Sequence, residues 1–61
     1  MPPKLKAFYE YVKAGKFYSY AQAMKDFGWT SKNAVYKKTV ELQKRGYVLV
    51  KETKYVIKKK N

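Results

Sequence analysis

The chain has 61 residues, enough for one small domain with a single core, and it carries a formal charge of +11 from 15 Lys and Arg against 4 Asp and Glu. Cys and His are both absent, so disulfides are excluded and a structural zinc site is close to excluded. Packing of the seven Tyr, three Phe and one Trp is therefore the main source of stability that the chain itself can supply.

The excess of positive charge indicates a polyanionic partner, because the charge would otherwise destabilise a compact chain by self-repulsion. Nucleic acid is the commonest such partner, an anionic membrane is a second candidate, and a solubilising lysine-rich surface is the third interpretation. We expect no membrane partner, since the N-terminus lacks a signal peptide and no stretch approaches about 18 apolar residues. The expected location is the cytoplasm, in association with the nucleoid.

The first predicted helix spans about residues 3–14. Its apolar residues recur at the spacing of one helix face: Leu5, Phe8, Tyr9 and Val12. Gly15 follows as a residue type that commonly ends helices. Residues 16–18 are too few for a helix and rich in strand formers, so they predict a short third strand near Phe17, which needs a partner elsewhere.

The second predicted helix spans about residues 20–27. Ser19 precedes it and Gln22 follows three residues later, which predicts a capping box. Gly28 is placed to end this helix, and Trp29 to fill the turn that comes next. The apolar positions of the helix are Ala21, Ala23, Met24 and Phe27.

The third predicted helix spans about residues 31–45 and follows a very short turn, so the two helices form a helix-turn-helix. Thr30 or Ser31 caps its start, and Gly46 ends it. The residues expected to face the core recur at i, i+4, i+7: Val35, Thr39 and Leu42, with Val40 flanking them.

Beyond the third helix the pattern changes to the alternation of strands, which predicts a two-stranded hairpin over residues 47–58. Residues 52–53 make a weak turn sequence without Gly or Asn, so a longer tip is an open alternative. A two-residue tip would give one apolar face of paired side chains: Val50 with Tyr55 and Val48 with Ile57. Residues 58–61 are expected to form a basic tail.

The order of the elements, the glycine positions and the segment SKNAVYKKTVELQKRGYV resemble those of LexA-type and MarR-type repressors. In these families the third helix ends in a leucine, several basic or polar residues, a glycine and apolar residues, as residues 42–48 do here. The resemblance covers about residues 5–58 and implies an α+β winged helix-turn-helix domain that occupies residues 1–61. Thr39 stands where these families carry a larger aliphatic residue, which puts tight packing of the core at that position in question.

In the winged helix-turn-helix fold the start of the third helix enters the major groove of DNA. The residues expected to point away from its core row and to contact bases are Lys32, Asn33, Tyr36 and Lys37. Asn suits adenine, Lys suits guanine, and Tyr suits a thymine methyl or a phosphate. Thr30 and Ser31 are placed for phosphate contact through hydroxyl and backbone N–H groups, and Lys51 and Lys54 for phosphate or minor-groove contact from the wing.

Each of these sets also has a plainer interpretation. The exposed face of the third helix is also what any solvated surface helix would show, and lysines in a hairpin also protect a strand edge from aggregation. The tyrosines are expected mainly in the core with their hydroxyls at the surface, rather than as stacking platforms for single-stranded nucleic acid.

We therefore expect a protein that binds double-stranded DNA as a sequence-specific transcriptional regulator and forms a homodimer through the aromatic residues of its first helix. A winged-helix module for protein or RNA, and a non-specific nucleoid protein, are the alternatives. Enzyme activity is not expected, because the four carboxylates lie in different elements and no His or Cys is present as base, nucleophile or ligand. No catalytic residue, metal or cofactor is predicted.

Overall fold

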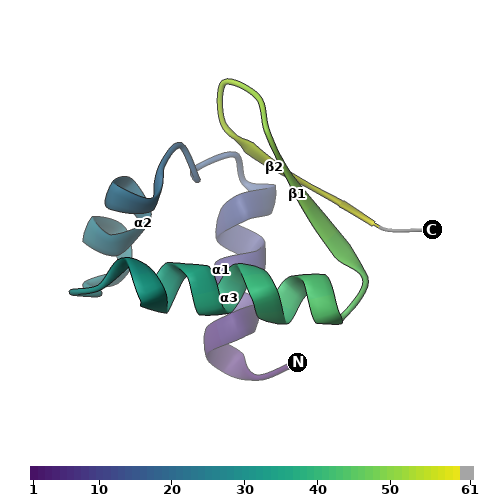
Figure 1. Cartoon of the computed structure of the whole chain (residues 1–61), viewed down its shortest axis with the longest axis horizontal. Helices are drawn as coiled ribbons and strands as arrows, with labels where there is room; N and C mark the ends of the chain where they lie inside the picture. Colours follow the sequence, from purple (N-terminus) through teal and green to yellow (C-terminus); the bar gives the residue numbers. More distant parts are fainter. Residues whose placement is uncertain (60–61) are drawn as a thin grey trace.

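A computed structural model of the chain describes residues 1–59, which form three helices followed by a two-stranded antiparallel sheet (Figure 1). The elements are α1 (Pro3–Lys13), α2 (Tyr20–Phe27), α3 (Lys32–Lys44), β1 (Tyr47–Lys51) and β2 (Tyr55–Lys59). This α+β arrangement confirms the predicted helices and hairpin, with closely matching bounds. Within residues 1–59, no helix combines the length and the apolar composition needed to cross a membrane.

The strand β2 extends further than predicted. It includes Lys59, which was expected in the basic tail, and residues 60–61 of that tail lie outside the described part of the chain. In Figure 1, α3 lies across α1, with α2 beside its first turns and the hairpin starting at its other end. The tip of the hairpin returns toward the connection between α1 and α2. Among the described residues 1–59, these contacts leave one long side of α3 uncovered.

The core is centred on Phe8 of α1 and on Phe17 of the α1–α2 connection, both fully buried. Their ring centroids lie 5.4 Å apart, and the rings of Phe27 and Trp29 lie 6.0 and 6.1 Å from that of Phe8. The other buried side chains come from all three helices: Leu5, Val12, Ala23, Val35, Thr39 and Leu42. Aromatic packing of this kind supplies the cohesion that disulfides or a metal would otherwise provide.

Most tyrosines pack against this core, which confirms their predicted position. Those that are half-buried against it are Tyr9, Tyr11, Tyr20, Tyr47 and Tyr55. The rings of Tyr9 and Tyr47 have centroids 5.1 Å apart, and those of Tyr11 and Phe27 are 4.8 Å apart. The aromatic side chains of α1, on which the predicted dimer surface depended, thus pack within their own chain. Dimerisation itself stays a prediction.

The turn between α2 and α3 is shaped by Gly28 and Trp29. Gly28 has a φ of +70°, a left-handed conformation that glycine adopts without the steric cost of a Cβ. Trp29 stacks on Phe27 with ring centroids 4.6 Å apart, so it fills the turn as predicted. Ser31, rather than Thr30, caps α3, because its Oγ accepts a hydrogen bond from the Asn33 N–H at 3.1 Å.

At the start of α2, Ser19 acts as the predicted cap: its Oγ accepts a hydrogen bond from the Gln22 N–H at 3.1 Å. The reciprocal half of the predicted capping box is wrong, because the Gln22 side chain instead donates to Asp26 Oδ1 at 2.9 Å. Ala21, one of the four apolar positions of the predicted helix, is exposed, whereas Ala23 is fully buried. One small residue, not two, therefore faces the core from this helix.

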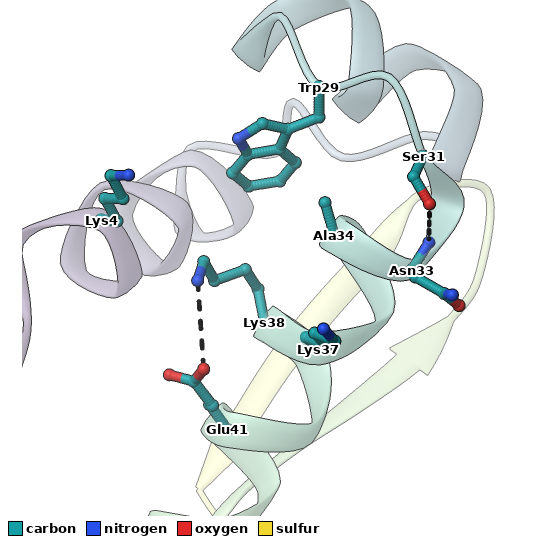
Figure 2. Close-up of a pocket in the computed structure, with 8 residues that line it drawn as sticks. All are labelled: Lys4, Trp29, Ser31, Asn33, Ala34, Lys37, Lys38 and Glu41. Carbon is teal, nitrogen blue, oxygen red and sulfur yellow. Dashed lines mark hydrogen bonds and ion pairs between the residues drawn. The ribbon is translucent and has the colours of Figure 1, made fainter.

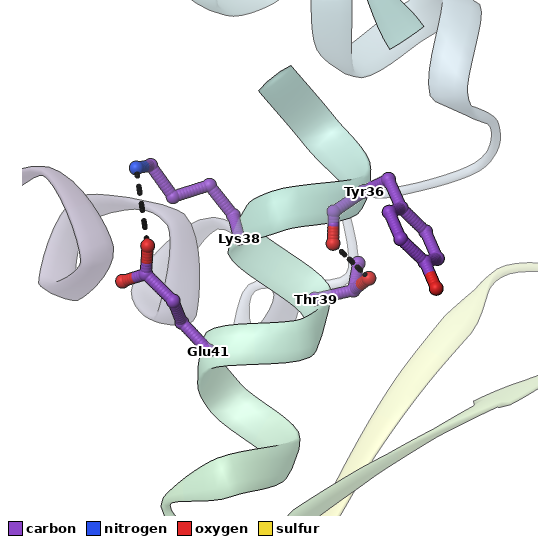
Figure 3. Close-up of polar contacts among 4 residues, drawn as sticks. All are labelled: Tyr36, Lys38, Thr39 and Glu41. Atoms are coloured by element: carbon purple, nitrogen blue, oxygen red, sulfur yellow. Dashed lines mark hydrogen bonds and ion pairs between the residues drawn. The ribbon is translucent and has the colours of Figure 1, made fainter. Parts of the chain in front are cut away.

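The predicted core row of α3 is confirmed, since Val35, Thr39 and Leu42 are all buried. Thr39 brings a hydroxyl into this row and satisfies it locally: Oγ1 donates to the Tyr36 carbonyl oxygen at 2.7 Å (Figure 3). The threonine is 5% exposed, so its side chain is enclosed despite its small size. The core therefore closes over this position without a larger aliphatic side chain.

The hairpin has a tip of residues 52–54, in which the Glu52 N–H donates to the Lys54 carbonyl at 2.9 Å. The register places Leu49 opposite Ile57 and Val50 opposite Val56. The longer tip is thereby confirmed, and the pairing that a two-residue tip would give, Val50 with Tyr55 and Val48 with Ile57, is wrong. The side chains on the core side are instead Tyr47, Leu49, Tyr55 and Ile57. Those of Val48, Val50 and Val56 alternate onto the outer face.

Phe17 explains why this register is chosen. The Tyr55 N–H donates to the Phe17 carbonyl oxygen at 2.8 Å, and the two rings stack with centroids 4.2 Å apart. Tyr55 is therefore the partner that the predicted third strand required. The third strand itself is wrong, because the sheet in the described residues has two strands and a single hydrogen bond does not extend it.

Candidate nucleic-acid interface

The surface of α3 divides into four rows because about 3.6 residues complete each helical turn. The core row faces inward, and one flank, with Lys38 and Glu41, faces α1 (Figure 3). Tyr36 lies on the opposite flank, toward the hairpin, as Figure 3 also shows. The outward row, opposite the core row, consists of Asn33, Lys37, Val40 and Lys44.

The four residues predicted to contact bases, Lys32, Asn33, Tyr36 and Lys37, are all exposed. Tyr36 is the one aromatic residue of α3, and 56% of its surface is accessible. The four do not form one row, however. Asn33 and Lys37 belong to the outward row, whereas Lys32 and Tyr36 lie on the flank toward the hairpin. The candidate surface is therefore wider than a single helix stripe.

A first groove, with a volume of about 460 Å³, runs between α3, the turn before it and α1 (Figure 2). It is lined by Lys4, Trp29, Ser31, Asn33, Ala34, Lys37, Lys38 and Glu41. Figure 2 shows the Trp29 indole projecting into the space between α1 and α3. The single carboxylate of this lining, on Glu41, lies 3.9 Å from the Lys38 ammonium. The groove therefore favours an anion such as a phosphate group.

A second, shallower groove, of about 220 Å³, lies on the outward side of α3 itself. It is lined by Tyr36, Lys37, Val40, Glu41 and Lys44. Lys37 and Glu41 border both grooves, so both residues lie at the centre of the candidate surface. Asn33 shares the first groove with Lys37, Tyr36 shares the second, and Lys32 borders neither.

The N-terminal end of α3 carries the two hydroxyl residues predicted to bind phosphate, and both Thr30 and Ser31 are exposed. The Ala34 N–H donates to the Ser31 carbonyl at 3.1 Å, and the Asn33 N–H donates to the Ser31 hydroxyl. These two backbone donors are thus used within the chain. The hydroxyl hydrogens of Thr30 and Ser31 remain suitable donors for a phosphate oxygen.

Lys51, predicted to bind phosphate from the hairpin, is held against the α1–α2 connection. Its ammonium group donates to the Tyr18 carbonyl oxygen at 2.9 Å and lies 4.7 Å from the centroid of the Tyr55 ring. The side chain stays exposed, so the remaining N–H bonds of the ammonium group face solvent. Lys51 can therefore hold the hairpin in place and contact an anion at the same time.

Lys54, the other predicted hairpin residue, folds back over Gly15. A Cβ added to Gly15 would lie 2.6 Å from the Lys54 Nζ, and Gly15 has a φ of +76°. The absence of a side chain at Gly15 thus lets this lysine approach the backbone that follows α1. Both hairpin lysines lie on the side of the tip that faces the α1–α2 connection, not at a free end of the hairpin.

Three residues of the candidate surface were not predicted to lie there: Val40, Lys44 and Lys4. The expectation that Val40 flanks the core row is wrong, because Val40 lies in the outward row and outside the core cluster. The sequence does contain a signal for the first two, because Asn33, Lys37, Val40 and Lys44 follow one another at spacings of three or four residues. Lys4 had no such signal, since its place in the first groove depends on how α1 packs against α3. The α1 lysine becomes part of the surface only through tertiary structure.

Two of the four carboxylates have partners within the chain, and the charge of one of them, Glu41, is offset by a lysine. Glu41 is paired with Lys38, and Asp26 accepts hydrogen bonds from the Tyr11 hydroxyl at 2.6 Å and from Gln22. Burial, together with the hydrogen bond and negative charge of Asp26, raises the pKa of Tyr11 well above its ordinary value of 10.0. The Tyr11–Asp26 bond also joins α1 to α2.

Comparison with protein-family models, with curated proteins and with solved structures found no match to this chain. The resemblance to LexA-type and MarR-type repressors consequently stays a prediction. The function has to be inferred from the residues, their charges and their arrangement.

Proposed function

We propose that this chain is a winged helix-turn-helix protein that binds duplex DNA and regulates transcription, with α3 in the major groove and the hairpin as the wing that contacts the backbone. The observation that carries the proposal is the uncovered side of α3. It presents an amide, a phenol and several lysines on a helix that α1, α2 and β1 support from behind. A helix presented in this way has the dimensions that the major groove admits.

The distribution of charge supports the same partner. The segment Lys32–Lys44 contains four lysines and one carboxylate, and that carboxylate is paired with Lys38. Two further lysines lie outside α3: Lys4 lines the groove on the α1 side, and Lys51 lies on the hairpin, bonded to the Tyr18 carbonyl oxygen with its side chain exposed. A helix placed in the major groove has a phosphate backbone on each side, and cations beyond the helix itself add to the charge that matches a duplex.

The experiment that tests the proposal is a titration of the full chain with duplex DNA across a salt series. We expect the logarithm of the binding constant to fall linearly with the logarithm of salt concentration, by about 0.9 for each phosphate that is neutralised. A slope near zero, or a bound protein partner with no duplex affinity at physiological salt, would show the proposal to be wrong.

Selection from random duplexes then distinguishes a regulator from a non-specific nucleoid protein. A regulator enriches a defined sequence, because contacts to base edges differ among the four base pairs. Equal recovery of all sequences, with the salt slope intact, would leave DNA binding standing and remove the regulatory part of the proposal. Single-stranded DNA and duplex RNA of equal length serve as competitors that test the RNA alternative.

A further inference from the structure

The second groove has an apolar centre on a surface that is otherwise polar and cationic. Val40 occupies the outward row of α3, between Lys37 and Lys44, and lines the groove together with Tyr36. Within residues 1–59, Val40 lies outside the cluster of side chains that forms the core. The branched apolar side chain is therefore not needed to hold α3 against α1, and its chemistry is available to a ligand.

We infer that Val40 and Tyr36 form an apolar contact for the 5-methyl group of thymine, so that the chain selects duplex sites with a thymine opposite the second groove. This inference rests on the proposed binding of duplex DNA. Among the four bases, thymine alone presents an apolar group at its major-groove edge, and the others present polar atoms or ring hydrogens there. A polar base atom placed against Val40 would lose its water without gaining a partner.

The rim of the groove favours a base edge over a phosphate as the occupant. Val40 at its centre offers no hydrogen-bond donor to a phosphate oxygen, and the charge of Glu41 on its rim is offset by Lys38 at 3.9 Å. Lys37 and Lys44 stand one turn to either side of Val40, where they can reach the backbone beyond the groove. Lys37 and Lys44 are thus placed for the DNA backbone, and Val40 between them is placed for a base.

The inference is tested with the full chain and the duplex site that selection returns. Each thymine of the site is replaced in turn by deoxyuridine, which keeps base pairing and removes only the methyl group. We expect one replacement to weaken binding about fourfold, the effect of exposing roughly one buried methyl group. Two further duplexes carry cytosine or 5-methylcytosine at that position. The duplex with 5-methylcytosine is expected to bind more tightly than the duplex with cytosine, because the two differ only in the methyl group.

Two variants connect the effect to the groove. In Val40→Ala the penalty for deoxyuridine is expected to fall below about twofold, since the contact is already lost. Val48→Ala removes the same atoms from a valine that is 37% exposed on the outer face of the hairpin, and it should keep the full penalty. Alanine is a good helix former, so Val40→Ala is expected to retain the fold, which a thermal melt checks.

The outcomes separate the inference from the proposal on which it rests. A selected site without thymine, a deoxyuridine penalty below about twofold at every position, or an unchanged penalty in Val40→Ala would overturn the inference while salt-dependent duplex binding still stood. Absence of salt-dependent duplex binding would overturn both.

Discussion

The Lys51 ammonium group donates a hydrogen bond to the Tyr18 carbonyl oxygen at 2.9 Å, and this bond joins the hairpin to the connection between α1 and α2. The same lysine lies over the Tyr55 ring, whose backbone N–H bonds to Phe17. The position of the hairpin beside α3 is thus set by contacts to a third segment of the chain. A residue predicted to contact DNA thus also holds the hairpin in place.

Replacing Lys51 by Met should reveal both roles. Loss of one phosphate contact is expected to reduce the salt dependence of DNA binding by about 0.9 and to weaken binding to all sequences alike. Loss of the bond to Tyr18, which lies near solvent, should lower the free energy of unfolding by about 1 kcal/mol or less. Duplex titrations and urea denaturation measure the two effects. Lys6→Met, an exposed lysine on α1, is the charge-matched control, and an equal change in its salt slope would contradict a specific contact at Lys51.

Asn33→Ala should relax sequence preference without disturbing the fold. The side chain is exposed, and the backbone N–H that donates to Ser31 is kept in the variant, so the cap of α3 remains. We expect the preference for adenine at one position of the site to fall by about 1–3 kcal/mol, the discrimination that one bidentate contact provides. Repeating the duplex selection with the variant measures this change. An unaltered consensus would exclude Asn33 from base contact.

Thr39→Val should be nearly neutral for stability, within about 1 kcal/mol. The Tyr36 carbonyl that accepts the Thr39 hydroxyl also lies within the helix, where the backbone offers it a second donor, so the variant leaves no buried acceptor without a partner. Thr39→Ala, which also removes a buried methyl group, should lower the free energy of unfolding by about 1 kcal/mol. Chemical denaturation distinguishes them. A large loss in Thr39→Val would mean that the hydroxyl itself holds the core together.

The Tyr11–Asp26 hydrogen bond predicts a loss of stability in alkali. Because the folded state raises the pKa of Tyr11 above 10.0, its contribution to stability is complete below that pH and is lost as pH rises toward the higher folded-state value. Unfolding free energy measured between pH 8 and 11 should therefore decline more steeply for the natural chain than for Tyr11→Phe. The variant keeps every other side chain, so effects of alkali on the rest of the chain are common to both proteins. Parallel curves for the two proteins would show that Tyr11 does not contribute.

The helices could be predicted from the sequence because their signals are local. The caps at Ser19 and Ser31, the glycines that end the helices and the spacing of Val35, Thr39 and Leu42 all lie within a few residues of the feature they determine. The same spacing predicted which residues of α3 are exposed. Val40 was expected beside the core row, whereas the same helical spacing places it in the outward row, between Lys37 and Lys44.

The hairpin register and the lysine positions could not be predicted in the same way. Tyr55 is positioned by the stacking and the backbone hydrogen bond of Phe17, a residue from the other half of the chain. This contact decides between tip lengths that the sequence of residues 52–54 leaves equal. The contacts of Lys51 with Tyr18 and of Lys54 with Gly15 depend in turn on that register. Distant contacts of this kind leave no periodic pattern in the sequence.

The hydrogen bond between Tyr55 and Phe17 also has a kinetic consequence. A two-stranded hairpin is at best marginally stable by itself. Here its inner face is completed by Phe17, which lies in the other half of the chain. Closing so long a loop costs entropy before any contact compensates for it. We therefore expect the helices to assemble first, and the candidate surface for DNA to be completed only in the last step of folding.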